Sequence, residues 1–331
     1  MSNKPILGIL LGDSAGVGPE IIAKAMASGL LTDVCKPLII GDCRVLEYGM
    51  QAAGIRTDYI AVDSPHGIDW NSATPVLDQK NQDPALIETG KVSAYTGKAV
   101  IDMLNLACDL CESGDIAGFV FAPLNKASML EAGCTFESET KMLASRFKVT
   151  GPYCELNVLD SLMTTRVTSH VPIAKVSDNL CVEGVLQATR LSHITAKRAG
   201  IKNPRIGVSA LNPHCGENGR CGREEIDIIA PAIELAIKEG IDATGPYSAD
   251  VLFIRAFRGD FDSVVTMYHD QGQIALKLKG PQLGVTVIGG IPYPIATPAH
   301  GTAFDIAGKG IASTAGFENA MQIVAKMAAG S

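Results

Sequence analysis

Short apolar runs that favour β-strands alternate with longer helical patterns along almost the whole chain. The strand-like runs lie at residues 6–11, 37–41, 117–123, 166–171, 205–211, 263–270 and 285–290. The clearest helical runs between them lie at residues 19–29, 92–112 and 224–240. Strands that are apolar throughout and alternate with helices are typical of a mostly parallel sheet covered on both faces. The sequence therefore predicts an α/β fold, whose ligands bind beyond the carboxyl ends of the strands.

No linker divides the chain into successive domains. We therefore expect two α/β lobes that share a sheet, with the chain passing from one lobe to the other and back. The predicted first lobe comprises residues 1–130 and 285–331, and the second comprises residues 131–284. Residues 63–83 are rich in Pro, Asn, Asp and Ser without periodicity, which predicts an excursion over the surface.

Composition narrows the function to small-molecule chemistry. The chain has 331 residues, of which 47% are hydrophobic and 19% charged, so it can fill the cores of two modest lobes. Its net charge of −7 excludes the basic surplus that nucleic acid or an anionic membrane would require. No apolar run approaches the roughly 18 residues of a membrane span, and no cleavage site follows the N-terminal apolar run, so we expect a soluble protein.

The cysteines predict a reducing compartment. Nine cysteines, an odd number without repeated spacing, do not form the pattern of a disulfide framework. Cys108 and Cys111 make a C-x-x-C pair, but they lie in a helical run with no second pair nearby, so we interpret them as ordinary helix residues. The expected location is the cytoplasm.

Three of the six histidines follow predicted strands, namely His170, His214 and His269. A single histidine at a strand end is more often a hydrogen-bonded polar residue than a metal ligand. If the three strands lie side by side, or if one comes from a partner subunit, the imidazoles converge and suit Zn²⁺, Co²⁺ or Mn²⁺ with positions left open. Asp270 can orient His269 or accept a proton, and Lys277 lies two helical turns farther along the chain.

Two glycine-rich segments adjoin predicted strands. Residues 12–20, G-D-S-A-G-V-G-P-E, place backbone N–H groups and an early proline where an anion can bind, but they do not fit the dinucleotide or Walker patterns. Residues 300–308, H-G-T-A-F-D-I-A-G, predict a tight turn that enters a helix. This second segment resembles the loop of isocitrate and isopropylmalate dehydrogenases that wraps the adenosine half of the cofactor. The resemblance implies that NAD or NADP contacts His300, Gly301, Thr302, Asp305 and Gly308.

Several uncommon motifs occur in one order and spacing between about residues 7 and 327. They are G-D-S-A-G-V-G-P-E, A-P-L-N-K, L-N-P-H-C-G-E, G-R-E-E-I-D, G-P-Y-S-A-D, M-Y-H-D-Q-G and H-G-T-A-F-D-I-A-G. Together they resemble the 4-hydroxythreonine-4-phosphate dehydrogenase family. The resemblance implies a two-lobed isocitrate-dehydrogenase-like fold and a homodimer with the active site at the subunit contact. It also implies one divalent ion (Zn, Co, Mn or Mg) on His170, His214 and His269.

The resemblance also implies a reaction. A small β-hydroxy acid is oxidised by NAD or NADP, and the β-keto acid then loses CO₂, with the divalent ion lowering the pKa of the alcohol and stabilising the enolate. Lys277 matches the family's substrate-binding lysine, which holds a carboxylate or moves a proton. Asp270 is the second predicted catalytic residue.

Three of the family's substrate-recognition positions carry other residues here. In F-E-S-E-T-K, Thr140 is kept, while Glu139 stands at the histidine position. Counting from His269, the family's asparagine falls on Thr286 and its arginine on Ile295. Loss of an arginine and gain of a carboxylate disfavour a phosphate by on the order of 2 to 5 kcal/mol.

We therefore expect a paralogue with an unphosphorylated substrate, either a sugar acid of the threonate or erythronate type or a terephthalate-type cis-dihydrodiol. The alternative is that nearby cations, such as Lys141 or Lys279, replace the lost ones.

Two other classes of protein remain as alternatives. Acyl and phosphate transferases share the broad fold, and they require neither metal nor nicotinamide. A two-lobed binding protein for a sugar acid is the other, but such receptors carry a signal peptide that is not seen here. The three histidines favour the dehydrogenase.

Overall fold

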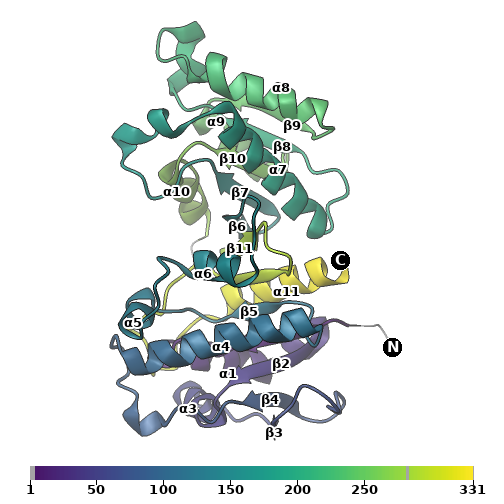
Figure 1. Ribbon diagram of the computed structural model, residues 1–331, viewed down its shortest axis with the longest axis vertical. Helices are drawn as coiled ribbons and strands as arrows, with labels where there is room; N and C mark the ends of the chain where they lie inside the picture. Colours follow the sequence, from purple (N-terminus) through teal and green to yellow (C-terminus); the bar gives the residue numbers. More distant parts are fainter. Residues whose placement is uncertain (1–3, 281–282, 331) are drawn as a thin grey trace. The chain divides into compact units, whose positions relative to one another are not determined.

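The computed structural model describes residues 4–280 and 283–330, which form two compact α/β units. The first unit comprises the described residues up to Val149 together with those from Ile291 onward, and the second comprises Thr150–Gly290. The chain thus leaves the first unit and returns to it, and the predicted α/β class with mostly parallel strands is confirmed (Figure 1).

The sheet of the first unit has the order β3-β4-β2-β1-β5-β12, and every pairing in it is parallel. Its strands are short and their central residues are mostly buried, as expected for a sheet covered on both faces. Their bounds are Ile6–Leu10 (β1), Lys36–Gly41 (β2), Tyr59–Val62 (β3), Thr74–Asp78 (β4), Phe119–Phe121 (β5) and Ile295–Pro298 (β12).

Helices pack against this sheet, with α4 on β1 and β2 and α11 on β5 and β12. Local signals set their ends: Ser93 caps the start of α4 by accepting from the Tyr95 N–H, and Gly114 ends it in the left-handed conformation. The bounds are Gly18–Ala27 (α1), Leu30–Val34 (α2), Cys43–Ala53 (α3), Ala94–Ser113 (α4), Lys126–Glu131 (α5), Glu139–Arg146 (α6) and Ala315–Ala329 (α11).

The boundaries between the units lie later than the expected 130/131 and 284/285. Helix α6 belongs to the first unit because Arg146, near its end, forms ion pairs with Asp109 and Glu112 of α4. At the other boundary, β11 pairs antiparallel with β6 along its whole length, which keeps residues up to Gly290 in the second unit.

The sheet of the second unit has the order β11-β6-β7-β10-β8-β9. Strand β6 runs antiparallel to both β7 and β11, and the other pairings are parallel. The bounds are Cys154–Leu159 (β6), Leu162–Arg166 (β7), Ile206–Ser209 (β8), Ala243–Tyr247 (β9), Ser263–Thr266 (β10) and Val285–Gly289 (β11).

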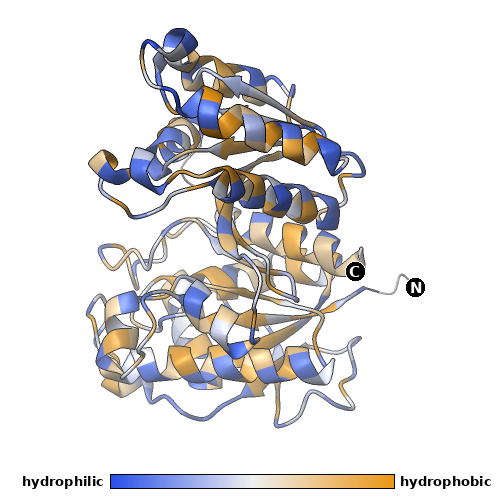
Figure 2. Cartoon of the chain, turned by 45° about the horizontal axis from the view of Figure 1, so that its top comes forward, coloured by the Kyte–Doolittle hydropathy of each residue, from blue (hydrophilic) through white to orange (hydrophobic). Residues whose placement is uncertain are grey.

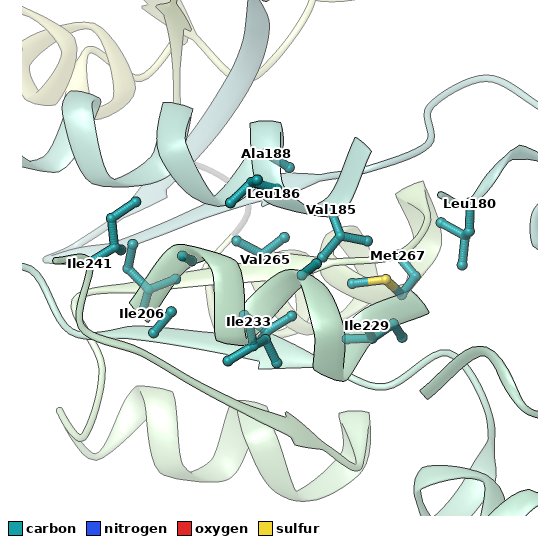
Figure 3. Close-up of a cluster of buried hydrophobic side chains, with 14 residues drawn as sticks. Leu180, Val185, Leu186, Ala188, Ile206, Ile229, Ile233, Ile241, Val265 and Met267 are labelled. Carbon is teal, nitrogen blue, oxygen red and sulfur yellow. The ribbon is translucent and has the colours of Figure 1, made fainter. Parts of the chain in front are cut away.

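A hydrophobic core of the second unit lies between helices α7 and α8 and strands β8 and β10. Side chains from α7, α8, β8 and β10 point toward one another there, among them Val185, Ile233, Ile206 and Val265 (Figure 3). The helix bounds are Val182–Arg198 (α7), Ala230–Lys238 (α8), Ala249–Phe257 (α9) and His269–Lys279 (α10), and a π-helical turn at Glu225–Ile229 precedes α8. Polar residues lie on the outer faces of the helices in both units, while the strands are largely apolar (Figure 2).

Two expectations about local structure were wrong. Residues 63–83 do not only cross the surface: Thr74–Asp78 forms β4, which lies between β2 and β3 with Val76 and Leu77 buried. The run at 166–171 is not a strand, because β7 ends at Arg166 and His170 has a φ of 42°. In both places pairing with neighbouring strands, rather than the local pattern, sets the strand bounds.

The prediction for the cysteine pair is confirmed. Cys108 and Cys111 are buried in α4, and burial raises the pKa of the Cys108 thiol to about 12. All nine cysteines are free. Within residues 4–280 and 283–330, no helix combines the length and the hydropathy of a membrane span.

The packing of α4 on α5 predicts a sharp effect of one methyl group. A Cβ at Gly97 would lie 1.9 Å from the carbonyl oxygen of Ser128, so Gly97→Ala should destabilise the fold by about 3 kcal/mol. The matched control is Gly184→Ala in α7, whose Cβ would meet its nearest atom at 3.4 Å and should stabilise by about 0.5 to 1 kcal/mol. Denaturant unfolding measures both, and equal stability of the two variants would contradict the close packing.

Candidate functional site

His170 and His269 meet beyond the carboxyl ends of two adjacent strands. Strands β7 and β10 pair in parallel, so the loop after β7 and the start of α10 lie at the same edge of the sheet. The centroids of the two imidazole rings are 5.8 Å apart. Both histidines line a cavity of about 210 Å³, with Asp270, Tyr268 and Ser169 also in its wall.

Asp270 sets the orientation of one of these rings. Its Oδ1 lies 2.7 Å from Nδ1 of His269, and the imidazole side chain is about one-third exposed. A carboxylate at Nδ1 favours the tautomer with the proton on that nitrogen, which leaves the Nε2 lone pair available to a ligand.

His214 is placed differently from the other two histidines. It lies in the loop after β8, is exposed, and is not among the residues that line the cavity. Its backbone and that of the next four residues are left-handed, a conformation that costs L-residues free energy. Within the described residues, no three His, Cys, Asp or Glu side chains are grouped closely enough to hold a metal ion. A single chain therefore brings together two of the three predicted ligands.

Glu225, which was not predicted as a site residue, holds the His214 loop. Glu225 is 3% exposed, and its Oε1 accepts hydrogen bonds from the N–H groups of Leu211 (2.8 Å) and Asn212 (2.7 Å). Its Oε2 accepts from the Asn212 side chain at 3.0 Å. Glu225 is the second glutamate of G-R-E-E. Its position in the sequence gave a signal of this role, because it is a carboxylate in the first turn of a helix that follows a glycine-rich loop.

Two further predicted residues lie in the second unit. Lys277 lies on α10, two turns after His269 as expected, and it is exposed. Thr286 lies in β11, and its Oγ1 accepts a hydrogen bond from Nδ2 of Asn157 at 3.2 Å.

Glu139 occupies the first turn of α6, where an anion would otherwise be favoured by the helix dipole. Its side chain is 15% exposed, and Nζ of Lys126 lies 3.4 Å from its Oε2. The adjacent Thr140 is buried. The local positive charge therefore already has a carboxylate partner.

The two lysines that might have replaced the lost cations are occupied elsewhere. Lys141 pairs with Glu137, and Nζ of Lys279 lies 5.7 Å from the ring centroid of Phe257. Ile295 is completely buried in β12 opposite Phe119, so this predicted substrate position is part of the apolar core.

The predicted cofactor loop does not enter a helix at once. Residues 301–314 are irregular, and the next helix begins at Ala315. Gly301, Asp305 and Gly308 are exposed and His300 is half-buried, whereas Thr302 is buried. Four of the five predicted positions can thus be reached by a ligand, and Thr302 instead anchors the loop.

The first glycine-rich segment supports this loop. The N–H of Val17 donates to the carbonyl of Thr302 at 3.0 Å, and the N–H groups of Asp13, Ala15 and Gly16 also donate to protein oxygens. A Cβ at Gly16 would lie 2.8 Å from Thr302, so only glycine allows this approach. These four N–H groups already have partners, so they are not available to the anion that the sequence predicted here.

Glu20 and Lys24 of α1 hold the far end of the same loop. Glu20 is 2% exposed and accepts from the N–H groups of Gly310 (3.2 Å) and Ala312 (2.8 Å). Lys24 pairs with Glu20 and donates to the carbonyls of the same two residues, each at 2.9 Å. One buried ion pair therefore satisfies four backbone groups of the loop.

The chain is similar along nearly its whole length to proteins named as dehydrogenases. A putative 4-hydroxythreonine-4-phosphate dehydrogenase 2 of Pseudomonas aeruginosa is 46% identical over 98% of this chain and 97% of its own length. A putative D-threonate 4-phosphate dehydrogenase of Oceanobacillus iheyensis is 40% identical over 94% of both chains. The crystal structure of a 4-hydroxythreonine-4-phosphate dehydrogenase from Klebsiella pneumoniae superposes with a TM-score of 0.88 and 32% identity over 98% of each chain. The protein is an oxidoreductase of the dehydrogenase class.

A family model also matches most of the chain. The profile described as "Pyridoxal phosphate biosynthetic protein PdxA" matches residues 33–324. The chain belongs to this family, and the resemblance inferred from its motifs is confirmed.

The buried Asp13 predicts a pH-dependent stability. Burial raises the pKa of this carboxyl above 3.8, although the Ala15 N–H opposes the shift. The contribution of Asp13 to the free energy of unfolding is therefore most favourable below pH 3.8. This contribution falls as the pH rises through the raised pKa of the folded state. Asp13→Asn stays neutral, so its unfolding free energy minus that of wild type should increase between pH 4 and 8.

The control for this measurement is Asp63→Asn. The Asp63 carboxylate is exposed, and its ion pair with Lys80 lowers its pKa. Its difference from wild type should change in the opposite direction over acid pH. A pH-independent difference for Asp13→Asn would show that the group ionises normally.

Proposed function

We propose that the protein is a divalent-metal-dependent dehydrogenase that oxidises a small β-hydroxy acid with NAD or NADP, followed by decarboxylation. The observation that carries the proposal is the pair of imidazoles, His170 and His269, at 5.8 Å on one cavity beyond the strand ends. Membership of a dehydrogenase family supports the reaction class.

The donor set fits a divalent ion. His269 is oriented by Asp270, and two imidazole ligands leave coordination positions for a third ligand and for substrate oxygens. When bound, the ion supplies Lewis-acid stabilisation of negative charge that develops on those oxygens. Zn²⁺, Co²⁺ and Mn²⁺ accept imidazole well, and Mg²⁺ prefers oxygen ligands.

His214 completes the site in this proposal through assembly of a homodimer. Exposed apolar side chains lie on the segments that carry the other two histidines: Ile173 is 70% exposed, and Ile274 and Leu278 of α10 are 59% and 84% exposed. Large apolar side chains in water favour a covering partner, and a second copy would bring a second His214 loop to this surface.

The other residues take the following roles. Lys277, exposed on the same helix as His269, holds the substrate carboxylate or transfers a proton to the product carbon. The exposed part of the loop from His300 to Gly308 binds the nicotinamide cofactor. Its rigidity, which comes from Glu20 and the glycine segment, lowers the entropy lost on binding.

We infer that the substrate carries no phosphate at the Glu139 position. The cation Lys126 and the start of α6 already face a carboxylate there, and Ile295 supplies no charge. Some relatives are named for phosphorylated acids, which argues against this inference. Activity on an unphosphorylated threonate-type acid and on a cis-dihydrodiol carboxylate therefore has to be compared with activity on phosphorylated acids.

The free cysteines support a location in the cytoplasm.

A first experiment tests the metal site. His269→Ala and His170→Ala should each lower metal-dependent NAD(P) reduction by at least a hundredfold, because a lost ligand weakens both metal binding and substrate orientation. The control is His66→Ala, which removes an exposed histidine beside Asp115. Direct titration with Co²⁺ gives a second readout. Full activity in either variant would contradict the proposal. Transferase activity that needs no metal would contradict it as well.

A second experiment tests the substrate. Glu139→His should raise kcat/KM for a 4-phosphorylated acid, relative to its unphosphorylated form, by tenfold or more, because it removes a charge that repels phosphate. Glu131→His is the matched control, since it makes the same change of charge on an exposed side chain at the end of α5 and leaves the Glu137–Lys141 pair intact. If the wild-type enzyme already prefers the phosphorylated acid strongly, the inference about Glu139 is wrong.

A further inference from the structure

A buried polar cluster links the two histidine segments, and Asn157 of β6 is its centre. The side chain oxygen Oδ1 accepts hydrogen bonds from Nη1 of Arg166 at 2.9 Å and from Nε2 of Gln273. Because two donors point at Oδ1, the amide orientation is determined, and Nδ2 faces Oγ1 of Thr286. Asn157 itself is 8% exposed.

The first arm of the cluster leads to His170. Arg166 is the last residue of β7, and its Nε donates to Oγ of Ser169 at 2.9 Å. Ser169 precedes His170 and lines the same cavity. One guanidinium therefore connects the end of the strand, the Asn157 oxygen and the loop that presents the imidazole.

The second arm leads to His269. Gln273 follows His269 by four residues on α10, which is about one helical turn. Its bond to Asn157 ties the start of the second turn of α10 to strand β6. The two histidine segments, which are 99 residues apart in the sequence, thus share one acceptor atom.

The charge of the cluster is balanced. Nη2 of Arg166 lies 3.2 Å from Oε2 of Glu155, and the two side chains are only 10% and 24% exposed. A guanidinium in such a site is retained only when its donors are satisfied, so the geometry around it is strongly constrained. Asn157, Arg166, Gln273 and Glu155 are not among the residues that line the cavity, and the proposed reaction does not require them as acids or bases.

We propose that Asn157, Arg166 and Gln273 form a positioning cluster that sets the separation of the His170 and His269 imidazoles and hence the affinity of the cavity for a divalent cation. The proposal rests on the function proposed above. It gives a role to the polar side chains of Asn157 and Arg166 on two adjacent strands: one shared acceptor adds side-chain bonds to the backbone bonds that already join the segments after β7 and β10.

The test is a Co²⁺ titration of the full-length protein, followed by visible absorption, with thermal unfolding measured on every variant. Asn157→Leu removes the shared acceptor and should weaken Co²⁺ binding by about tenfold, the lower end for residues that support metal ligands. Gln273→Leu cuts only the second arm, on a helix surface where folding is safer, and should weaken binding several-fold. Asn157→Asp keeps both acceptor bonds and should bind Co²⁺ within about twofold of wild type.

Ser192→Ala is the control, because it removes a buried hydroxyl pair with Ser263 in the same unit but outside the cluster. It should lower the unfolding temperature and leave Co²⁺ affinity unchanged. Affinity within twofold of wild type in both Leu variants would overturn the inference and leave the proposed function standing. Absence of Co²⁺ binding in the wild-type protein would instead overturn the proposed function, and the inference with it.

Discussion

Parallel pairing of the strands is the constraint on which the rest of this structure depends. Parallel strands end at a common edge, so segments far apart in sequence are delivered to the same place. In the second unit β7 and β10 deliver His170 and His269 to one cavity, and in the first unit β1 and β12 deliver the two glycine-rich segments to each other. The candidate site residues therefore lie mostly just beyond strand ends, and the sheets decide which of these segments meet.

Each loop that carries candidate site residues is held by a buried polar group from a neighbouring element. Glu20 holds the loop after β12, Glu225 holds the His214 loop, and Asn157 joins the segments of His170 and His269. A buried carboxylate or amide can satisfy several backbone or side chain donors at once, which a hydrophobic contact cannot do. This arrangement gives rigid loops without long helices or strands, at the cost of strict geometry around each buried group.

Much of the candidate site could be predicted from sequence because its residues lie in short motifs that follow strands. His269 with Asp270, and the H-G-T-A loop, were found in this way, and so was the family. The supporting residues were missed for a physical reason. Asn157 is an ordinary strand residue in sequence, and its importance arises from bonds to Gln273 and Thr286, more than a hundred residues away. Arg166 is another, and it reaches Asn157 from the neighbouring strand. At residues 12–20, where an anion site was expected, the N–H groups of Asp13 and Val17 donate to Pro123 and Thr302, partners that no local pattern reveals.

The sequence by itself determined the α/β class, the strand-to-loop positions of the histidines and the membership of a dehydrogenase family, because hydrophobic periodicity and short motifs are local properties. Tertiary structure decided that Ile295 is a core residue, that Thr302 is an anchor and that β4 is an interior strand, since burial depends on what packs opposite. It also decided that only two of the three predicted ligands meet within one chain. Convergence of side chains is a property of strand order and loop conformation, and neither is encoded in the spacing of the residues.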